Sequence, residues 1–462
     1  MELHERLQKA GAGELRSAPR TDPFAEVKDR IHLALVSELG PRLFEVGDNG
    51  SVRSRVEEEI RTQLMQEASL SRDDRERVAG DIADDIFGYG PLERLILDST
   101  ISEIMVNGPH EIWVERRGLL SRTGLTFADE SHLRRIITKM VGQVGRRIDE
   151  SSPMVDARLP DGSRVNAIIS PLSLSGPLLT IRKFAQGRFD MEELVRIGTL
   201  SREGLDFLDM CVKAELNMLI SGGTGTGKTT LLNALSSAVP DRDRIVTIED
   251  AAELQLAQQH VVRLESRPKN IEGEGEITIR DLVRNALRMR PDRIIVGEVR
   301  GAEALDMLQA MNTGHEGSLS TVHANSPRDA LSRLETMVLM AGYELPLKAI
   351  RQHVSSALDL IVQIDRLDDG TRHVTAITEV QRMEGDAITL QNLFEFQVER
   401  VEADRTVVGQ LQVTGLRPGF LSKFARHGID IPPNLFQGQV TSLYGPRVDD
   451  ARYERRAAGG SR

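Results

Sequence analysis

Cysteine is almost absent from this sequence, since Cys211 is the only one among 462 residues. A single cysteine cannot form an intrachain disulfide, and it also excludes a four-cysteine zinc ribbon. Such scarcity is typical of proteins that work in a reducing compartment. We therefore expect a cytoplasmic protein whose stability comes from hydrophobic cores rather than covalent links.

Long hydrophobic runs are lacking as well. No apolar run approaches the roughly 20 residues that a membrane-spanning helix requires. The first 20 residues are charged and contain no apolar segment, so they do not resemble a signal peptide. We expect any contact with a membrane to go through partner proteins.

Positive charge and aromatic side chains are both scarce. The sequence has 59 Lys and Arg residues against 70 Asp and Glu residues, for a net charge of −11, and 4% aromatic residues. Nucleic-acid-binding proteins are usually basic, and single-strand binders stack bases on aromatic rings. The composition therefore argues against nucleic acid as a partner, whereas 40% hydrophobic and 28% charged residues fit a globular protein.

Changes in pattern along the chain predict five segments. Residues 23–85 show apolar side chains at helical spacing, and residues 101–184 mix short strands, turns and one helix. From 205 to 379, helices alternate with continuous apolar strands, which indicates a parallel sheet covered on both faces. The last strand-like runs are 360–364 and 374–380. The predicted segments are a helical extension (1–85) with a loose first 20 residues, an α+β domain (86–185), a hinge (186–201), an α/β domain (202–440) and a polar tail (441–462).

A complete phosphate-binding loop of the form GxxxxGK[ST] follows the predicted strand 216–220 and precedes a helix. Its glycines let the backbone N–H groups turn toward phosphate oxygens, and the helix N-terminus favours negative charge. Lys228 is suited to the β- and γ-phosphates of ATP, and the Thr229 hydroxyl to Mg²⁺. The predicted nucleotide-binding residues of this loop are Gly222, Gly223, Thr224, Gly225, Thr226, Gly227, Lys228, Thr229 and Thr230.

Acidic residues follow two other predicted strands. Glu298 comes just after the apolar run 294–296, where an acid can help to hold Mg²⁺. Many nucleotide-hydrolysing folds carry Asp directly at that strand end, whereas this chain has Gly297 first, so Glu298 could reach the metal through water. Glu249, Asp250 and Glu253 follow the strand 245–248 and could position Mg²⁺ or polarise the attacking water. An acidic helix start is the alternative interpretation.

Two histidines frame a further predicted strand. His323, followed by Asn325, is expected at the carboxyl edge of the sheet, where ligands bind in α/β folds. There it could sense the γ-phosphate, although a structural role stays open for it and more so for His315. Their spacing does not place two zinc ligands on one helical face.

The order of these motifs resembles the ATPases of the type II/type IV secretion and pilus superfamily, and most closely its CpaF-like Tad/Flp pilus branch. The phosphate loop, the acidic segment 247–253, residues 297–300 and the two-histidine segment occur in the family's order. Four further segments look like that branch: 103–107, 156–166, 267–276 and 285–291. Type II relatives often carry a four-cysteine zinc module, so the single cysteine favours the Tad-like or type IV branches.

The resemblance implies a RecA-like P-loop ATPase domain, hinged to the α+β domain, in a homo-hexameric ring. It implies hydrolysis of ATP with Mg²⁺, and work on an inner-membrane platform protein that drives pilus assembly or secretion. It implies Glu253 as the residue that positions water, Glu298 as the strand-end acid, and phosphate contacts from Arg158, Arg164 and Arg182. Those arginines could act within one chain or across a subunit interface.

Arg158 and Arg164 also flank the turn 159–163, so both could leave one hairpin end together, and the guanidinium fork suits phosphate. Two other functions stay open. A hexameric nucleic-acid motor such as a helicase shares the RecA-like core, although charge and aromatic content argue against it. The second alternative function is a nucleotide-binding regulator that hydrolyses slowly. The acidic residues at two strand ends argue against this function.

Overall fold

The computed structural model describes residues 49–437, except 68–69, 117, 185–189, 268, 270–273, 404 and 434, and also residues 24, 27, 28, 30, 31, 34 and 35. The predicted loose first 20 residues and the polar tail 441–462 lie outside the described residues. The chain divides into two compact units, Met1–Gln186 and Gly187–Arg462, and each is described by itself.

The first unit begins with two described helices, α3 (Asn49–Met65) and α4 (Arg72–Phe87), which pack on each other. Val56, Ile60 and Leu64 recur at helical spacing on α3 and are buried against apolar residues of α4. The side chain of Ser71 accepts a hydrogen bond from the N–H of Asp74 and so caps the start of α4.

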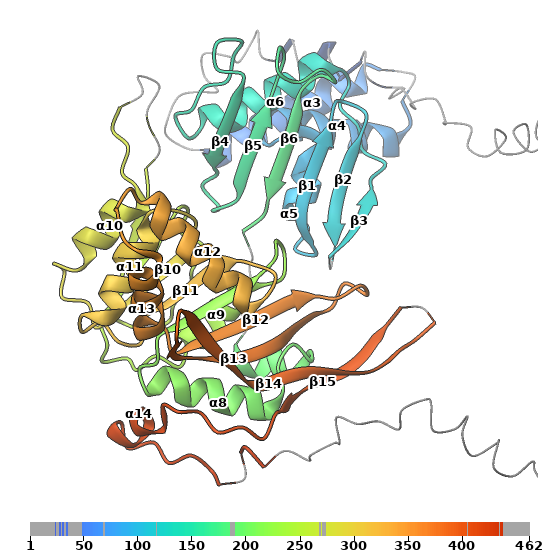
Figure 1. The fold of residues 1–462 in the computed structure, drawn as a ribbon. Coiled ribbons are helices and arrows are strands. Elements are labelled where there is room, and N and C mark those ends of the chain that lie inside the picture. The colour runs from blue at the N-terminus through green and yellow to red at the C-terminus, as the bar shows by residue number, and fades with distance from the viewer. Residues whose placement is uncertain are drawn as a thin grey trace, which may run out of the picture. The chain divides into compact units, whose positions relative to one another are not determined.

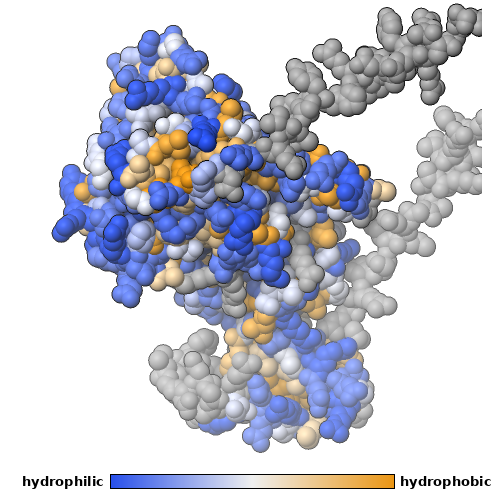
Figure 2. Space-filling model, turned by 90° about the horizontal axis from the view of Figure 1, so that it is seen from below, coloured by the Kyte–Doolittle hydropathy of each residue, from blue (hydrophilic) through white to orange (hydrophobic). Residues whose placement is uncertain are grey.

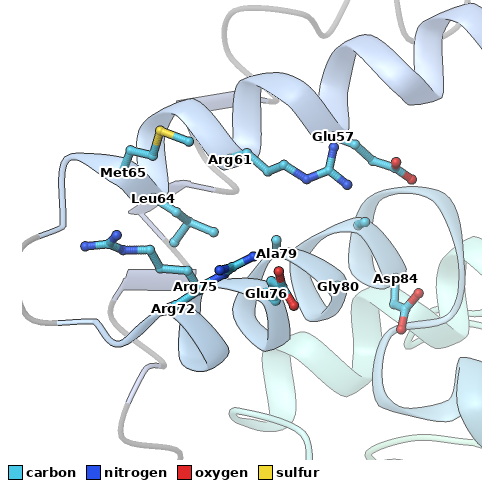
Figure 3. Close-up of a pocket in the computed structure, with 11 residues that line it drawn as sticks. Glu57, Arg61, Leu64, Met65, Arg72, Arg75, Glu76, Ala79, Gly80 and Asp84 are labelled. Carbon is cyan, nitrogen blue, oxygen red and sulfur yellow. The ribbon is translucent and has the colours of Figure 1, made fainter.

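A pocket of about 700 Å³ lies between α3 and α4 (Figure 3). Its lining combines a small apolar floor with arginine and carboxylate side chains of both helices. The lining residues are Glu57, Arg61, Leu64, Met65, Arg72, Arg75, Glu76, Ala79, Gly80, Ala83 and Asp84. None of them belongs to the site residues that the sequence predicts.

The rest of the first unit is a six-stranded antiparallel sheet in the order β3-β2-β1-β6-β5-β4 (Figure 1). Every second residue in most of these strands points toward α6 and packs with it into one hydrophobic core. The residues between them point to the opposite face of the sheet. The elements are η1 (Gly90–Leu92), α5 (Glu93–Leu97), β1 (Ile101–Asn107), β2 (Ile112–Arg116), β3 (Leu119–Arg122), α6 (Glu130–Gly142), β4 (Met154–Arg158), β5 (Arg164–Ile168) and β6 (Leu178–Arg182).

The second unit contains a nine-stranded sheet in the order β15-β14-β13-β12-β7-β11-β10-β8-β9. The six neighbouring strands β12, β7, β11, β10, β8 and β9 run parallel to one another. Beyond β12, the strands β13, β14 and β15 extend the sheet, and each is antiparallel to the strand before it. The strands are β7 (Met218–Gly222), β8 (Ile245–Glu249), β9 (Val261–Glu265), β10 (Arg293–Val299), β11 (Leu319–His323), β12 (Leu360–Arg366), β13 (Arg372–Glu384), β14 (Ala387–Val401) and β15 (Val407–Val413).

Helices cover both faces of the parallel strands, as the sequence predicted. Met218 and Ile220 of β7 join a core with α8 and α9, whereas Leu219 between them joins a second core with α10 to α13. This alternation is how a strand serves two buried faces. The helices are α7 (Met191–Arg196), α8 (Arg202–Lys213), α9 (Lys228–Ser236), α10 (Ile279–Ala286), α11 (Glu303–Asn312), α12 (Pro327–Met340), α13 (Leu347–Ala357) and α14 (Leu421–Arg426).

The sequence-based prediction was wrong about where the sheet ends. It took 374–380 as the last strand, but β13 continues to Glu384, and β14 and β15 follow (Figure 1). Most residues in the second half of β14 are exposed, so this strand lacks the continuous apolar run that marks the parallel strands. The predicted fold class is confirmed. The chain has an α/β unit with a RecA-like parallel core, preceded by an α+β domain and a helical extension.

The visible face in Figure 2 is mostly hydrophilic, with hydrophobic side chains gathered in separate patches. Exposed apolar residues at the end of α12 and the start of α13 include Leu339, Met340, Tyr343 and Leu347. Among the residues that the structure describes, no helix combines the length and the hydrophobicity that crossing a membrane would take.

Candidate nucleotide-binding site

The phosphate loop joins β7, an inner strand of the parallel sheet, to the N-terminus of α9. Gly225 and Gly227 have φ angles of 71° and 100°, a left-handed conformation that glycine adopts without strain. Gly227 is also the residue from which α9 begins. The loop therefore has the backbone path by which N–H groups can converge on an anion at a helix N-terminus.

Gly222 is required by close packing rather than by its backbone angles. A Cβ atom at this position would lie 2.3 Å from the carbonyl oxygen of Ile364 and 2.6 Å from Oγ1 of Thr226. Ile364 belongs to β12, which pairs with β7. A side chain at residue 222 would thus push the loop away from the neighbouring strand.

Lys228 lies folded over the start of the loop. Its Nζ donates hydrogen bonds to the carbonyl oxygens of Gly222 (3.0 Å) and Gly223 (2.8 Å). The Thr226 hydroxyl donates to the carbonyl of Gly223 at 3.0 Å. The ammonium group is thereby held within the loop, where it is available to phosphate oxygens.

The two candidate histidines lie at opposite ends of β11. His323 is the last residue of that strand and pairs with Gly222 of β7, and its Nδ1 is 3.5 Å from the Thr224 hydroxyl. His315 precedes the strand, on the amino side of the sheet, where its carbonyl accepts a hydrogen bond from Ser318. Only His323 is brought to the phosphate loop within this unit.

The strand β8 ends at Glu249, whose side chain turns inward. Its Oε2 accepts hydrogen bonds from the N–H groups of Glu253 (2.8 Å) and Leu254 (2.9 Å). Burial raises the pKa of Glu249, and these two hydrogen bonds oppose that shift. Its other oxygen is buried and has no hydrogen-bond partner within the described part of the chain.

Gly297 allows this carboxylate to pack beside β10. A Cβ atom at Gly297 would lie 2.9 Å from Cγ of Glu249, whose side chain is held by two backbone hydrogen bonds. A larger residue at 297 would displace Glu249. The departure from the usual strand-end Asp therefore has a physical reason, because that position faces the carboxylate of the neighbouring strand.

Glu298, the next residue on β10, pairs with an arginine. Oε2 of Glu298 accepts a hydrogen bond from Nε of Arg300 at 2.9 Å, and the same guanidinium lies 3.3 Å from Asp250. Arg300 therefore links Glu298, which lies within β10, to Asp250, which follows the neighbouring strand β8. For Glu298 to help hold Mg²⁺, it must share its carboxylate with Arg300.

Glu253 is half-buried and lies on the segment that leaves β8. Two residues later, the N–H of Gln255 donates to Oδ1 of Asn233 on α9 at 2.8 Å. The segment thus runs from the end of β8 to the helix that begins at the phosphate loop. Sequence position alone gave no such link between the acidic segment and α9.

The three candidate arginines form one row in the first unit. Arg158 on β4 lies directly opposite Arg164 on β5, which lies directly opposite Arg182 on β6. Opposite residues of antiparallel strands share a face, with Cβ atoms roughly 4.5–5.5 Å apart, and like charges there are destabilising. The row continues to Glu103, whose pKa is raised by burial, a shift that Arg182 opposes. Three adjacent guanidinium groups are suited to bind an anion.

Magnesium fits this site only as an ion that protein side chains hold together with phosphate oxygens and water. No group of three or more His, Cys, Asp or Glu side chains within the described ranges could hold a metal by itself. Protein sites for Mg²⁺ commonly supply one or two ligands and leave the rest to phosphates and water. Thr229, at the start of α9, and Glu298 remain the side-chain ligands that the sequence predicts.

Comparison with known proteins matches residues 86–403 to the family described as Type II/IV secretion system protein. The chain belongs to this family. The superfamily that the motifs predicted is thereby confirmed, whereas the CpaF-like branch stays a prediction.

Two relatives agree with the family match by their sequence identity. The type IV secretion system protein PtlH of Bordetella pertussis is 39% identical over 293 residues, which are 58% of this chain and 86% of that protein. The conjugal transfer protein TrbB of Rhizobium radiobacter is 34% identical over 295 residues, covering 62% and 85%. Among solved structures, the VirB11 ATPase of the Brucella suis type IV secretion system is 30% identical, covers 62% of this chain and 94% of that chain, and has a TM-score of 0.35.

Sequence reasoning missed one residue that touches the loop of this secretion-family protein. Nε of Arg372, the first residue of β13, donates a hydrogen bond to the carbonyl of Gly225 at 2.9 Å. The sequence predicted strand-like runs at 360–364 and 374–380, on either side of Arg372. It contained no signal that connects this part of the chain with a loop 147 residues earlier.

Proposed function

We propose that this chain is an ATP-hydrolysing motor subunit that powers pilus assembly or protein secretion. The observation that carries the proposal is the complete phosphate loop at the carboxyl end of β7, within a chain of the type II/IV secretion family. ATP is the substrate, and Mg²⁺, when bound, would neutralise charge that develops on the transferred phosphoryl group.

Within the loop, Gly222, Gly223, Thr224, Gly225, Thr226, Gly227 and Thr230 supply backbone N–H groups and shape. Lys228 moves from the loop carbonyls to the phosphate oxygens, an exchange of neutral for charged acceptors that strengthens its hydrogen bonds. Thr229 and Glu298 would hold Mg²⁺. His323, beside Thr224, reports whether the γ-phosphate is present.

Glu253 orients the attacking water, since its neighbour Glu249 is occupied in holding the backbone of the same segment. Glu249 is the runner-up for this task, because a carboxylate whose pKa is raised is the stronger base. Both carboxylates belong to the segment at the end of β8, which contacts α9 through the hydrogen bond from Gln255 to Asn233.

The arginine row supplies positive charge to the same phosphates. Arg158, Arg164 and Arg182 lie in the other unit, so either closure within one chain or a neighbouring subunit must bring them in. We propose a homo-hexameric, cytoplasmic ring that reaches the membrane through an inner-membrane platform protein, and the Tad/Flp pilus branch as its place in the family.

The direct test of this function is ATP turnover by the purified chain, with and without the cytoplasmic part of a candidate platform protein. The proposal expects turnover that requires Mg²⁺ and rises when the platform fragment is added. Single-stranded or double-stranded DNA serves as the comparison ligand. Stimulation by DNA at low salt, and none by the platform fragment, would instead support a nucleic-acid motor.

The ring is tested by mixing two inactive variants, Lys228→Ala and the double variant Arg158→Ala/Arg164→Ala. If the arginines act across an interface, some mixed interfaces contain an intact loop and intact arginines, and activity returns. If they act within a chain, mixing restores nothing. Light scattering with ATP and Mg²⁺ is expected to show a hexamer, and a fully active monomer would contradict the ring.

A further inference from the structure

The hairpin between β12 and β13 ends beside the phosphate loop. Residues 360–363 of β12 pair in parallel with residues 218–221 of β7, so the rest of β12 continues past the strand end where the loop begins. The hairpin turn is closed by hydrogen bonds between Leu367 and Thr371 and between Gly370 and Leu367, both 2.9 Å. The first residue of β13 is therefore held at the loop.

That residue, Arg372, approaches the loop with both its guanidinium group and its aliphatic stem. Its Nε donates a hydrogen bond to the carbonyl of Gly225 at 2.9 Å. Its Cδ lies 3.5 Å from the position of a Cβ atom on Gly227, which is ordinary contact distance for the aliphatic stem. Arg372 thus donates a hydrogen bond to one left-handed glycine of the loop, Gly225, and its stem passes close to the other, Gly227.

The hydrogen bond to Gly225 has a consequence for the next amide. In a trans peptide, the carbonyl of one residue and the N–H of the following residue point in opposite directions. With the Gly225 carbonyl directed to Arg372, the N–H of Thr226 must point away from the hairpin. Consecutive N–H groups held in this manner form the concave anion site of a phosphate loop.

Arg372 and Lys228 act on different parts of the loop. Lys228 holds the carbonyls of Gly222 and Gly223, whereas Arg372 holds the carbonyl of Gly225 from another strand. Lys228 must leave its carbonyls to reach phosphate, whereas the contact from Arg372 can persist when nucleotide binds, as can the hydrogen bond from the Thr226 hydroxyl to Gly223. Arg372 therefore holds a part of the loop that neither Lys228 nor Thr226 holds through these bonds.

We infer that Arg372 is a positioning residue that presets the phosphate loop for ATP from the β12–β13 hairpin. This inference rests on the proposed ATPase function. A preset loop lowers the entropy lost on binding and does so equally for the ground state and the transition state. Loss of Arg372 should therefore raise KM for ATP and leave kcat nearly unchanged.

The test compares Arg372→Ala with Arg382→Ala, a matched removal of an arginine from the same strand. We expect a KM for ATP about tenfold higher in Arg372→Ala, as for loss of a hydrogen bond from a charged donor, and kcat within about twofold of the unsubstituted chain. Arg382→Ala should leave both constants unchanged. Arg372→Lys, which keeps a charged donor on a flexible stem, should recover part of the loss.

An unchanged KM in a folded Arg372→Ala protein would overturn the inference, and so would a loss confined to kcat. If Arg372→Ala does not fold, Arg372→Gln gives the same comparison with the length of the side chain largely kept. Binding of a fluorescent ATP analogue distinguishes a failure of the proposed ATPase function from a failure of the role of Arg372. No binding by the unsubstituted chain contradicts the proposed function, whereas normal binding by both proteins overturns only the role of Arg372.

Discussion

Replacing Gly222 by alanine adds one methyl group at the tightest point of the phosphate loop. The new Cβ atom would lie 2.3 Å from the Ile364 carbonyl oxygen, 2.6 Å from Oγ1 of Thr226 and 3.1 Å from Cγ2 of Ile364. The nearest atom belongs to the backbone of β12, which is hydrogen-bonded between β7 and β13. It cannot retreat without loosening two strand pairs.

Overpacking of this kind costs about 1–3 kcal/mol, and the backbone contact favours the upper part of that range. The second unit is large, so the melting temperature should fall by only several degrees. Binding should suffer more, because the methyl group displaces the first residue of the loop. We expect a loss of ATP affinity of at least about tenfold, which corresponds to roughly 1.4 kcal/mol.

The matched control is Gly223→Ala, one residue further along. There the nearest atom to a Cβ would be Cγ2 of Thr226 at 3.5 Å, an ordinary contact. Thermal unfolding with and without ATP and Mg²⁺ measures stability and binding together. Gly223→Ala should keep normal stability, whereas Gly222→Ala should lose both stability and ATP affinity. Equal behaviour of the two variants would refute the claim that β12 fixes the loop.

Three further predictions concern acidic residues of the site. Glu253→Gln should lower kcat with little change in ATP affinity, and full activity in this variant would transfer the role to Glu249. Glu298→Gln should give a defect that is partly relieved by high Mg²⁺, and a defect independent of Mg²⁺ would exclude a metal role. For Glu249, the raised pKa means that the folded state holds the proton more tightly, so ionisation destabilises it and stability is lost as pH rises above about 4.5. The stability of Glu249→Gln relative to the unsubstituted chain, measured by urea unfolding, should therefore increase as the pH rises above about 4.5, and a difference in stability that does not change with pH would contradict this.

The sequence was sufficient where the decisive pattern is local. The phosphate loop is one continuous segment, and the strand before it and the helix after it were both recognisable from neighbouring residues. The parallel core was predictable for the same reason, because strands buried on both faces are continuously apolar. The turn 159–163, flanked by Arg158 and Arg164, was also recognisable from neighbouring residues.

The remaining features depend on contacts between distant segments. Alignment of Arg182 with Arg164 is set by the register of β5 and β6, which no local pattern specifies. The approach of Arg372 to Gly225 follows from strand order in the sheet. The role of Gly297 is visible only when β10 and the side chain of Glu249 are placed together.

Phosphate release by the full chain measures directly whether the phosphate loop around Lys228 hydrolyses ATP. The measurement compares the unsubstituted protein with Lys228→Ala at saturating ATP and Mg²⁺, with thermal unfolding to verify that both are folded. Removal of a charge directed at the β- and γ-phosphates should slow turnover on the order of 10³-fold or more, several kcal/mol of transition-state stabilisation. Equal turnover by the two folded proteins, or none by the unsubstituted chain in the presence of its platform fragment, would contradict the claim.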